Sequence, residues 1–164
     1  MADSLKERAV HLVVHEGWLL DRRQWDEWLG LYREDAVYWL PCFKDEHQLT
    51  EDPEKELSLV YYGSRAGLED RVFRLRTERS LASTPLPRTC HMVSVVDCMV
   101  ENDGSVRVES NWTTHSYKFE KATSFFGTQT HILREDDDGE LRITWREVIV
   151  MNDMIPSVLD IYSV

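Results

Sequence analysis

Cysteine is scarce in this chain of 164 residues, which contains only Cys42, Cys90 and Cys98. Because the three are odd in number and widely spaced, they do not suit a disulfide framework, and we expect reduced thiols. Basic residues are also few: 19 lysines and arginines stand against 30 aspartates and glutamates, which gives a net charge of −11. An acidic chain repels phosphate groups, so the composition argues against nucleic acid and anionic membranes as partners.

Long apolar runs are missing as well. No stretch approaches the roughly 20 apolar residues of a membrane-spanning helix, and residues 1–7 lack the basic and then apolar order of a secretion signal. These absences predict a cytoplasmic protein. The composition, 42% hydrophobic and 30% charged, fits a single globular domain over residues 1–164 that is long enough to bury a core.

The first half of the chain carries three helical patterns. Asp3 or Ser4 can cap a helix that ends near Leu20. Its buried face would consist of Leu5, Val10, Leu12, Val13 and Trp18. Asp21 and Gln24 have the spacing of a capping pair, which predicts a second helix. The apolar residues of that helix are Trp25, Trp28, Leu29 and Leu31.

Ser64 can cap the third helix, which has one apolar stripe. The stripe is Leu68, Val72 and Leu75. Two strands are expected before this helix, at 36–43 and 57–62, because both segments are rich in strand-forming residues. The polar segment 44–56 between them lacks periodicity and predicts an exposed loop.

Strand patterns fill the chain from Arg88 onward. The predicted strands are 89–101, 106–119, 124–134 and 140–151. Asn102-Asp103-Gly104 and Asp138-Gly139 suit tight hairpin turns, whereas the connection near Lys121 is less clear. The pattern therefore predicts an antiparallel meander.

The last predicted strand changes the parity of its apolar positions. Leu141, Ile143 and Trp145 are expected to face the core, but the apolar positions become even-numbered after Glu147. Such a switch indicates a bulge or a second covered face. The apolar stretch 158–162 is expected to pack against the domain.

Helices, a strand, a helix and then a long meander define an α+β protein. We expect the helices to pack on the concave side of one strongly curved sheet of mixed but largely antiparallel strands. This order resembles the cone-shaped fold shared by nuclear transport factor 2, ketosteroid isomerase and scytalone dehydratase. A fold does not by itself decide function.

Residues that bind metals do not form a recognisable set. Glu7, His11 and His15 recur every four residues, but about 12 Å of helix rise separates the first from the last, so all three cannot reach one ion. Only one Cys-His pair, Cys90-His91, occurs, and Cys98 stands alone, whereas a Rieske cluster needs two such pairs. We therefore nominate no catalytic, cofactor-binding or metal-binding residue and interpret Cys90 and Cys98 as core residues.

Hydratases and isomerases of the cone fold place an aspartate or histidine inside the cavity as general acid or base. The candidates here are Asp35, His91, Asp97 and His115. A buried carboxylate beside a histidine would suit proton abstraction. Two alternatives follow: a stand-alone lyase or isomerase using His91 or His115 with an acidic partner, and a ligand-binding homodimer without chemistry.

Aromatic side chains are frequent on the predicted strands. They are Trp112, Tyr117, Phe119, Phe125 and Phe126. They can line a ligand pocket or fill the core, and a third interpretation is a subunit contact with Arg88, Arg142 and Arg146 beside it.

Several segments carry a closer resemblance than the fold. They are 54–62 (EKELSLVYY), 65–75 (RAGLEDRVFRL), 87–91 (PRTCH), Asn111-Trp112, Phe126-Gly127 and 152–162. In these segments the chain resembles the small (beta) subunit of aromatic-ring-hydroxylating dioxygenases, in the benzoate, toluate and anthranilate branch. The resemblance covers nearly the whole chain, and 68–75 with Arg88-Thr89 is its most specific part.

The resemblance implies a non-catalytic subunit that holds catalytic large (alpha) subunits together. The large subunit would hold the Rieske 2Fe-2S cluster and the mononuclear iron, receive electrons from a reductase and oxidise an aromatic carboxylate such as benzoate or anthranilate. Three large and three small subunits would form a hexamer. The resemblance carries no cofactor or active-site residue over to this chain, and in some relatives the small subunit also biases substrate choice.

Overall fold

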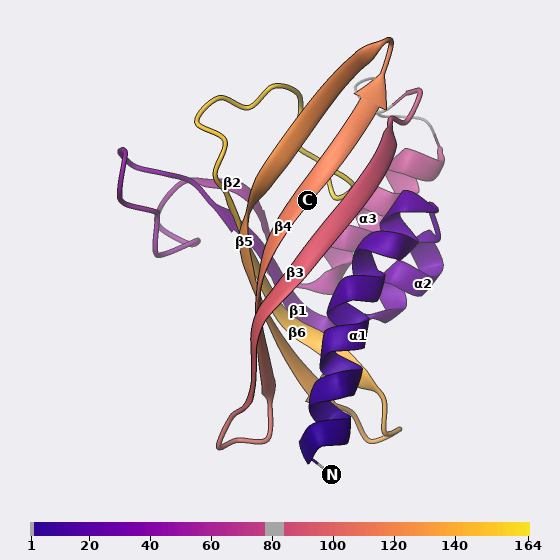
Figure 1. The fold of residues 1–164 in the computed structure, drawn as a ribbon, viewed down its shortest axis with the longest axis vertical. Helices are drawn as coiled ribbons and strands as arrows, with labels where there is room; N and C mark the ends of the chain where they lie inside the picture. Colours follow the sequence, from indigo (N-terminus) through magenta and orange to yellow (C-terminus); the bar gives the residue numbers. More distant parts are fainter. Residues whose placement is uncertain (1, 78–83) are drawn as a thin grey trace.

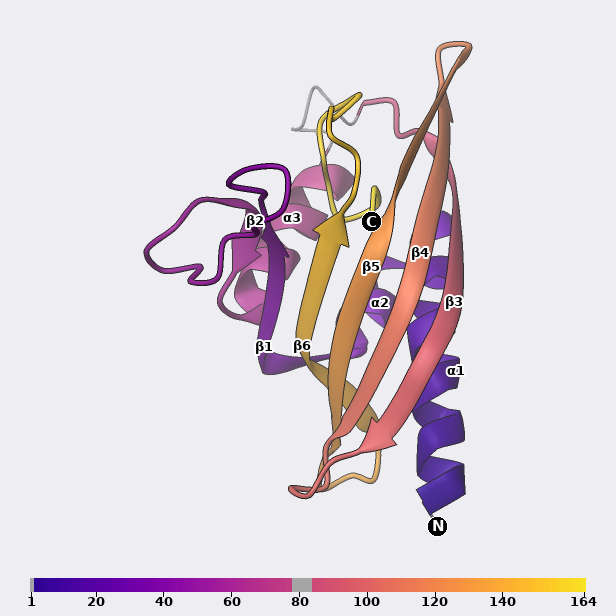
Figure 2. The ribbon, with the colours of Figure 1, turned by 60° about the vertical axis from the view of Figure 1, so that its left-hand side comes forward.

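The computed structural model describes residues 2–77 and 84–164. The elements in chain order are α1 (Ala2–Asp21), α2 (Trp25–Gly30), β1 (Tyr32–Pro41), β2 (Ser58–Tyr62), α3 (Arg65–Arg76), β3 (Arg88–Val100), β4 (Val106–Lys118), β5 (Lys121–Glu135) and β6 (Leu141–Val150). The helices cover one face of a strongly bent sheet, as Figures 1 and 2 show. This confirms the predicted α+β architecture.

The sheet has the strand order β2-β1-β6-β5-β4-β3. Strands β3 to β6 form the predicted antiparallel meander, whereas β1 joins it by parallel pairing with β6. Gly104 and Gly139 take the left-handed conformation at two of the turns, with φ of 82° and 79°. Phe119 and Glu120 do so at the third, so the connection near Lys121 is also a two-residue hairpin.

The packing of α3 follows from its sequence. Leu68, Val72 and Leu75 are buried, as their spacing predicts. Ser64 occupies the N-cap position, although its side chain makes no capping hydrogen bond. Arg71, on another face, forms an ion pair with the buried carboxylate of Asp160.

The predicted buried face of α1 is partly wrong. Trp18 is 52% exposed and lies under the guanidinium of Arg22, whose carbon is 3.0 Å from the ring centroid. The buried stripe is instead Ala9, Val13, Glu16 and Leu20. The spacing of apolar residues alone does not predict this stripe, because one of its members carries a carboxylate.

Asp21 does not form the predicted capping pair. It is the last residue of α1, and its carboxylate binds β3. Gln24 does occupy the N-cap of α2, but without a side-chain hydrogen bond. The predicted second helix exists, though α2 is only six residues long.

The parity switch in β6 is a bulge, located slightly earlier than predicted. The β5–β6 register shifts between Ile132 and Leu133, opposite Trp145 and Ile143. Trp145 therefore lies on the outer face, where its ring meets Trp39 at 6.0 Å, and Arg146 points into the core. The inward prediction for Trp145 was wrong because the extra residue precedes it.

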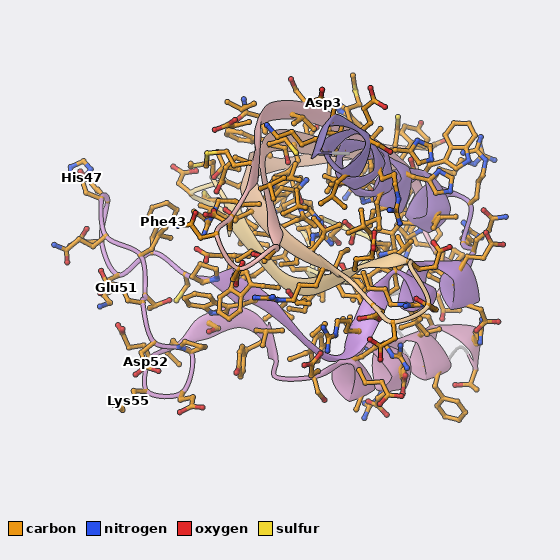
Figure 3. All side chains as sticks on the ribbon, turned by 90° about the horizontal axis from the view of Figure 1, so that it is seen from below. Asp3, Phe43, His47, Glu51, Asp52 and Lys55 are labelled. Carbon is orange, nitrogen blue, oxygen red and sulfur yellow. The ribbon has the colours of Figure 1, made fainter. Side chains whose placement is uncertain are left out.

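Strand β1 begins at Tyr32, four positions before the predicted start, because Tyr32 already pairs with Ile143 of β6. Segment 44–56 forms the predicted exposed loop, which extends away from the sheet in Figure 3. The hydrophobic core lies between the helices and the concave face of the sheet. Within the described residues, every helix is too short or too polar to cross a membrane.

After β6 the chain passes one end of the sheet and then turns back toward the helix-covered face (Figure 1). We call residues 151–159, which have no regular structure, the strap. Residues 160–164 are buried, so the apolar tail packs as predicted, except that Val158 is exposed. The Arg71–Asp160 ion pair anchors this segment to α3.

Candidate functional site

Glu16 is the centre of a polar network inside the cone. The stripe of α1 directs its carboxylate into the core, where it is 2% exposed. Its Oε1 accepts hydrogen bonds from Trp28 Nε1 at 3.3 Å, from Arg146 at 3.0 Å and from the Tyr32 hydroxyl. Its Oε2 lies 2.8 Å from His131 Nε2. The network thus joins both N-terminal helices to β1, β5 and β6.

The network contains a buried ion pair and a neutral histidine. Burial alone would raise the pKa of Glu16, but the Arg146 guanidinium and the hydrogen bonds from His131 and Tyr32 outweigh it and lower this pKa to about 2. Burial lowers the pKa of His131, so its imidazole is neutral near pH 7 and donates through Nε2. Glu16 is therefore charged and Arg146 balances it.

Arg146 makes further contacts that fix its position. It donates to Gln129 Oε1 at 3.1 Å, and its guanidinium carbon lies 5.3 Å from the centroid of the Tyr38 ring. The space left beside this network, next to Thr114, is only about 10 Å³, the room of one water molecule. This part of the interior is too full for an organic substrate.

His91 has the acidic partner that a stand-alone lyase would require. Its Nδ1 lies 2.5 Å from Asp21 Oδ1, and its Nε2 lies 3.2 Å from the backbone oxygen of Val164. Asp21 also accepts hydrogen bonds from the His91 amide at 2.9 Å and the Thr89 hydroxyl at 2.8 Å. Both ring nitrogens are occupied and the ring is 5% exposed, so the pair fastens α1 to β3.

The other candidate acid–base residues do not join His91. His115 is exposed on the opposite face of the sheet, with Nδ1 3.2 Å from the Ser124 hydroxyl. Asp35 is exposed beside Arg33, and Asp97 is exposed and accepts a hydrogen bond from the following amide. The four candidates therefore do not form one acid–base site.

The three cysteines are free thiols. Cys90 is exposed on the outer face opposite His115, so its interpretation as a core residue was wrong, because its position on β3 turns outward. Cys98 is half-buried toward α1, where its sulfur approaches the Lys6 carbonyl. Across residues 2–77 and 84–164, no three His, Cys, Asp or Glu side chains gather as a metal site would require.

The aromatic residues divide between the core and the surface. Trp112 and Phe125 are buried, whereas Tyr117, Phe119 and Phe126 are exposed. Of the three arginines named for a subunit contact, only Arg88 accompanies the exposed set, since it is exposed and pairs with Tyr117 across β3 and β4. Arg146 is buried in the network, and Arg142 forms ion pairs with Asp136 and Asp138 at the β5–β6 turn.

The end of the sheet at the β5–β6 turn carries an open groove of about 860 Å³. Its lining is Arg33, Glu34, Asp35, Arg65, Glu135, Asp136, Asp137, Asp138 and Arg142. All three arginines form ion pairs with acidic residues of this groove. We call this end of the molecule the acidic end.

Sequence reasoning missed the Glu16 network. The signal that would have found it is a carboxylate on an apolar stripe, since Ala9, Val13, Glu16 and Leu20 follow the helical period. A charge at such a position demands a buried partner. The parity switch in β6 would then have suggested Arg146.

Asp21→Asn is expected to lower the free energy of unfolding at pH 7 by about 2 kcal/mol, because three hydrogen bonds lose their charged acceptor. Burial raises the pKa of Asp21, but hydrogen bonds from His91 and Thr89 outweigh this and lower it below 3.8. The carboxylate's contribution is thus present above pH 3.8 and is lost as pH falls below it. Urea unfolding at pH 7 and pH 3 measures both effects.

Asp26→Asn is the control for this variant. Asp26 pairs with Arg76 at 2.8 Å but its side chain is 81% exposed, so its loss is expected to cost less than about 0.5 kcal/mol. Equal effects of the two substitutions would contradict the role assigned to Asp21.

The fold and the filled interior define a cone-shaped α+β protein of the kind represented by NTF2-like proteins. A solved NTF2-like protein with a cystatin-like fold from Novosphingobium aromaticivorans matches with a TM-score of 0.63 and 16% identity, over 95% of this chain and 86% of that one. At this identity the likeness shows the fold alone.

The chain belongs to the ring hydroxylating beta subunit family, whose model matches residues 15–157. The 2-halobenzoate 1,2-dioxygenase small subunit of Burkholderia cepacia is 44% identical over 155 residues, which cover 94% of this chain and 93% of that protein. The solved beta subunit of the benzoate 1,2-dioxygenase of Burkholderia mallei is 36% identical, with a TM-score of 0.78 and 95% coverage of both chains. The resemblance read from the sequence is therefore confirmed.

Proposed function

We propose that this chain is the non-catalytic small subunit of the terminal oxygenase of an aromatic-ring dioxygenase that acts on an aromatic carboxylate of the benzoate type. It would act as a single domain in the cytoplasm and hold catalytic large subunits together, three of each in a hexamer. The observation that carries the proposal is the 44% identity to a halobenzoate dioxygenase small subunit over nearly the full length of both chains.

The chemistry of the chain supports a division of labour between subunits. A Rieske cluster and a mononuclear iron need cysteine, histidine and carboxylate ligands that lie close together. Here Cys90 and Cys98 lie eight positions apart on β3 and turn to different sides of the sheet, and His91 is occupied by Asp21. The donors among residues 2–77 and 84–164 do not fit either group, so we place both in the large subunit, together with the contact to the reductase.

The space inside the cone decides how well the chain fits the alternative of a stand-alone lyase. An acid–base enzyme of the cone fold needs space for its substrate beside the catalytic pair. Both ring nitrogens of His91 are hydrogen-bonded, and the network around Glu16 fills the interior beside the His91–Asp21 pair. The pair also borders an open surface hollow of about 660 Å³ beside Trp18 and Arg22, so the space next to it lies outside the cone and not within it. These observations favour an assembly role over catalysis within this chain.

Co-expression with the large oxygenase subunit from the same organism tests the proposal. We expect the two chains to co-purify in equal numbers with the mass of a hexamer in native mass spectrometry, and to oxidise benzoate when a reductase is supplied. The purified small subunit is expected to be inactive alone. A homodimer that does not bind the large subunit would contradict the proposal, and so would turnover by the small subunit alone.

A further inference from the structure

The end of the sheet opposite the acidic end carries a second groove, of about 370 Å³. The turn of the β4–β5 hairpin, the strap and the buried segment 160–164 all contribute to its lining. In both ribbon views the yellow strap lies at the same end of the sheet as this hairpin (Figures 1 and 2). We call it the hairpin groove.

The hairpin groove has the opposite charge to the rest of the molecule. Lys118 and Lys121 are the charged residues of its lining. Its lining therefore carries a charge of +2 in a chain whose net charge is −11. The groove at the acidic end, in contrast, has six carboxylates and three arginines.

The hairpin groove is bordered by exposed apolar side chains. We call these the strap patch: Phe119, Phe126, Met151, Met154, Ile155 and Val158. Phe119 and Val158 also line the groove, and they are 71% and 66% exposed. Exposed apolar side chains gathered at one end of a soluble domain often mark contacts with other proteins.

Hydrogen bonds hold the base of the strap against β5. The Met151 amide donates to the Phe126 carbonyl at 2.8 Å. Asn152 continues the pairing with its side chain, which accepts from the Phe126 amide at 3.1 Å and donates to the Ser124 carbonyl at 2.9 Å. These bonds hold the backbones of Phe126 and Met151 next to each other, and both side chains are exposed.

We propose that the hairpin groove and the strap patch dock an acidic segment of the large subunit that carries apolar anchor residues. This inference rests on the proposed function, which supplies the partner. The two lysines attract carboxylates, and the flexible side chains of Met151 and Met154 adapt to an apolar surface. A two-fold contact with a second copy of this chain would bring both pairs of lysines together. A head-to-tail contact with the acidic end of a second copy is the alternative that the test below distinguishes.

The test compares two double variants of the full chain in complex with the large subunit from the same organism. Lys121→Glu with Val158→Asp changes the hairpin groove. Lys55→Glu with Leu57→Asp makes matched changes, again a lysine to glutamate and an aliphatic side chain to aspartate, at two residues that are both 81% exposed and do not line the groove. Lys55 lies on the loop labelled in Figure 3. All four positions are exposed, so both proteins are expected to fold, as circular dichroism and thermal unfolding would verify.

The measurement is the dissociation constant of the small subunit from the large subunit at several salt concentrations. We expect the groove variant to bind at least about tenfold more weakly and the control variant to stay within about twofold of the wild type. The wild-type affinity is also expected to fall as salt rises, and the affinity of the groove variant to depend less on salt.

Three results would overturn the inference. The first is wild-type affinity in the groove variant, and the second is an equal loss in both variants. The third is unchanged binding to the large subunit together with lost association between small subunits, which would assign the surface to a second copy. If the wild-type chain itself did not bind the large subunit, the proposed function would be wrong. If the wild type binds but one of the three results above is found, only the docking inference is wrong.

Discussion

Glu16→Gln is expected to lower the free energy of unfolding by about 3–5 kcal/mol at pH 7. Glutamine has nearly the same shape, so the substitution removes the charge and leaves Arg146 buried without a counter-ion. The hydrogen bonds from Tyr32 and His131 also lose their charged acceptor. Urea unfolding followed by tryptophan fluorescence measures the change, because Trp28 contacts the substituted group.

Two controls make this prediction specific. Glu135→Gln removes the same charge from an ion pair with Arg8 at 2.7 Å, but both side chains are more than 40% exposed and the cost is expected to stay below about 1 kcal/mol. The double variant Glu16→Gln with Arg146→Met is expected to recover part of the loss, since no buried charge is left. A Glu16→Gln effect no larger than that of Glu135→Gln would show that the network is not a buried ion pair.

Stability is expected to fall at acid pH for the same reason. The pKa of Glu16 is about 2 in the folded chain and 4.5 ordinarily, so its contribution is complete above pH 4.5 and declines as pH falls toward 2. The pKa of His131 is also lowered on folding, so its contribution declines in the same direction below pH 6.5. Glu16→Gln should therefore show a flatter acid limb than the wild type between pH 4.5 and 2.

Gly127→Ala is the second substitution with a large expected effect, about 3 kcal/mol or more of destabilisation. A methyl group at Gly127 would overlap the carbonyl oxygen of Ile149 in the next strand. A backbone atom within a ladder cannot move aside as a flexible side chain does, so β5 and β6 would have to separate. This would disturb the same sheet region that positions Arg146 and the start of the strap.

Gly30→Ala adds the same methyl group where nothing lies within 4 Å. Gly30 is the exposed last residue of α2, so alanine is expected to be neutral or to stabilise by about 0.5–1 kcal/mol. Parallel thermal and urea unfolding of the two variants gives the comparison. Similar midpoints for both would contradict the close approach of β5 and β6 at Gly127.

Local signals in the sequence predicted the elements that depend on near neighbours. The spacing of Leu68, Val72 and Leu75 gave the buried side of α3, and Gly104 and Gly139 gave two of the hairpins. In each case the physical cause, a helical period or a positive φ, lies within a few residues.

The features that sequence reasoning missed depend on distant partners. Asp21 has the local spacing of a helix cap, but the hydrogen-bond donors of β3 bind it instead. One bulge near Trp145 exchanges the faces of Trp145 and Arg146, and no alternation of residue types locates that bulge to the residue. The filled site inside the cone was missed because its members come from five elements, none of which has an unusual pattern by itself.

The long sequence separation in the Glu16 network affects how the chain folds during its synthesis. Glu16 and Arg146 lie 130 positions apart, so at about 5–20 residues per second the carboxylate is made about 7–26 s before its counter-ion. Strand β6, which carries Arg146, is also the parallel neighbour that β1 requires. The nascent chain therefore exposes β1 and cannot bury Glu16 with its charge balanced until β6 is made, so stable folding of the whole domain follows the last part of translation.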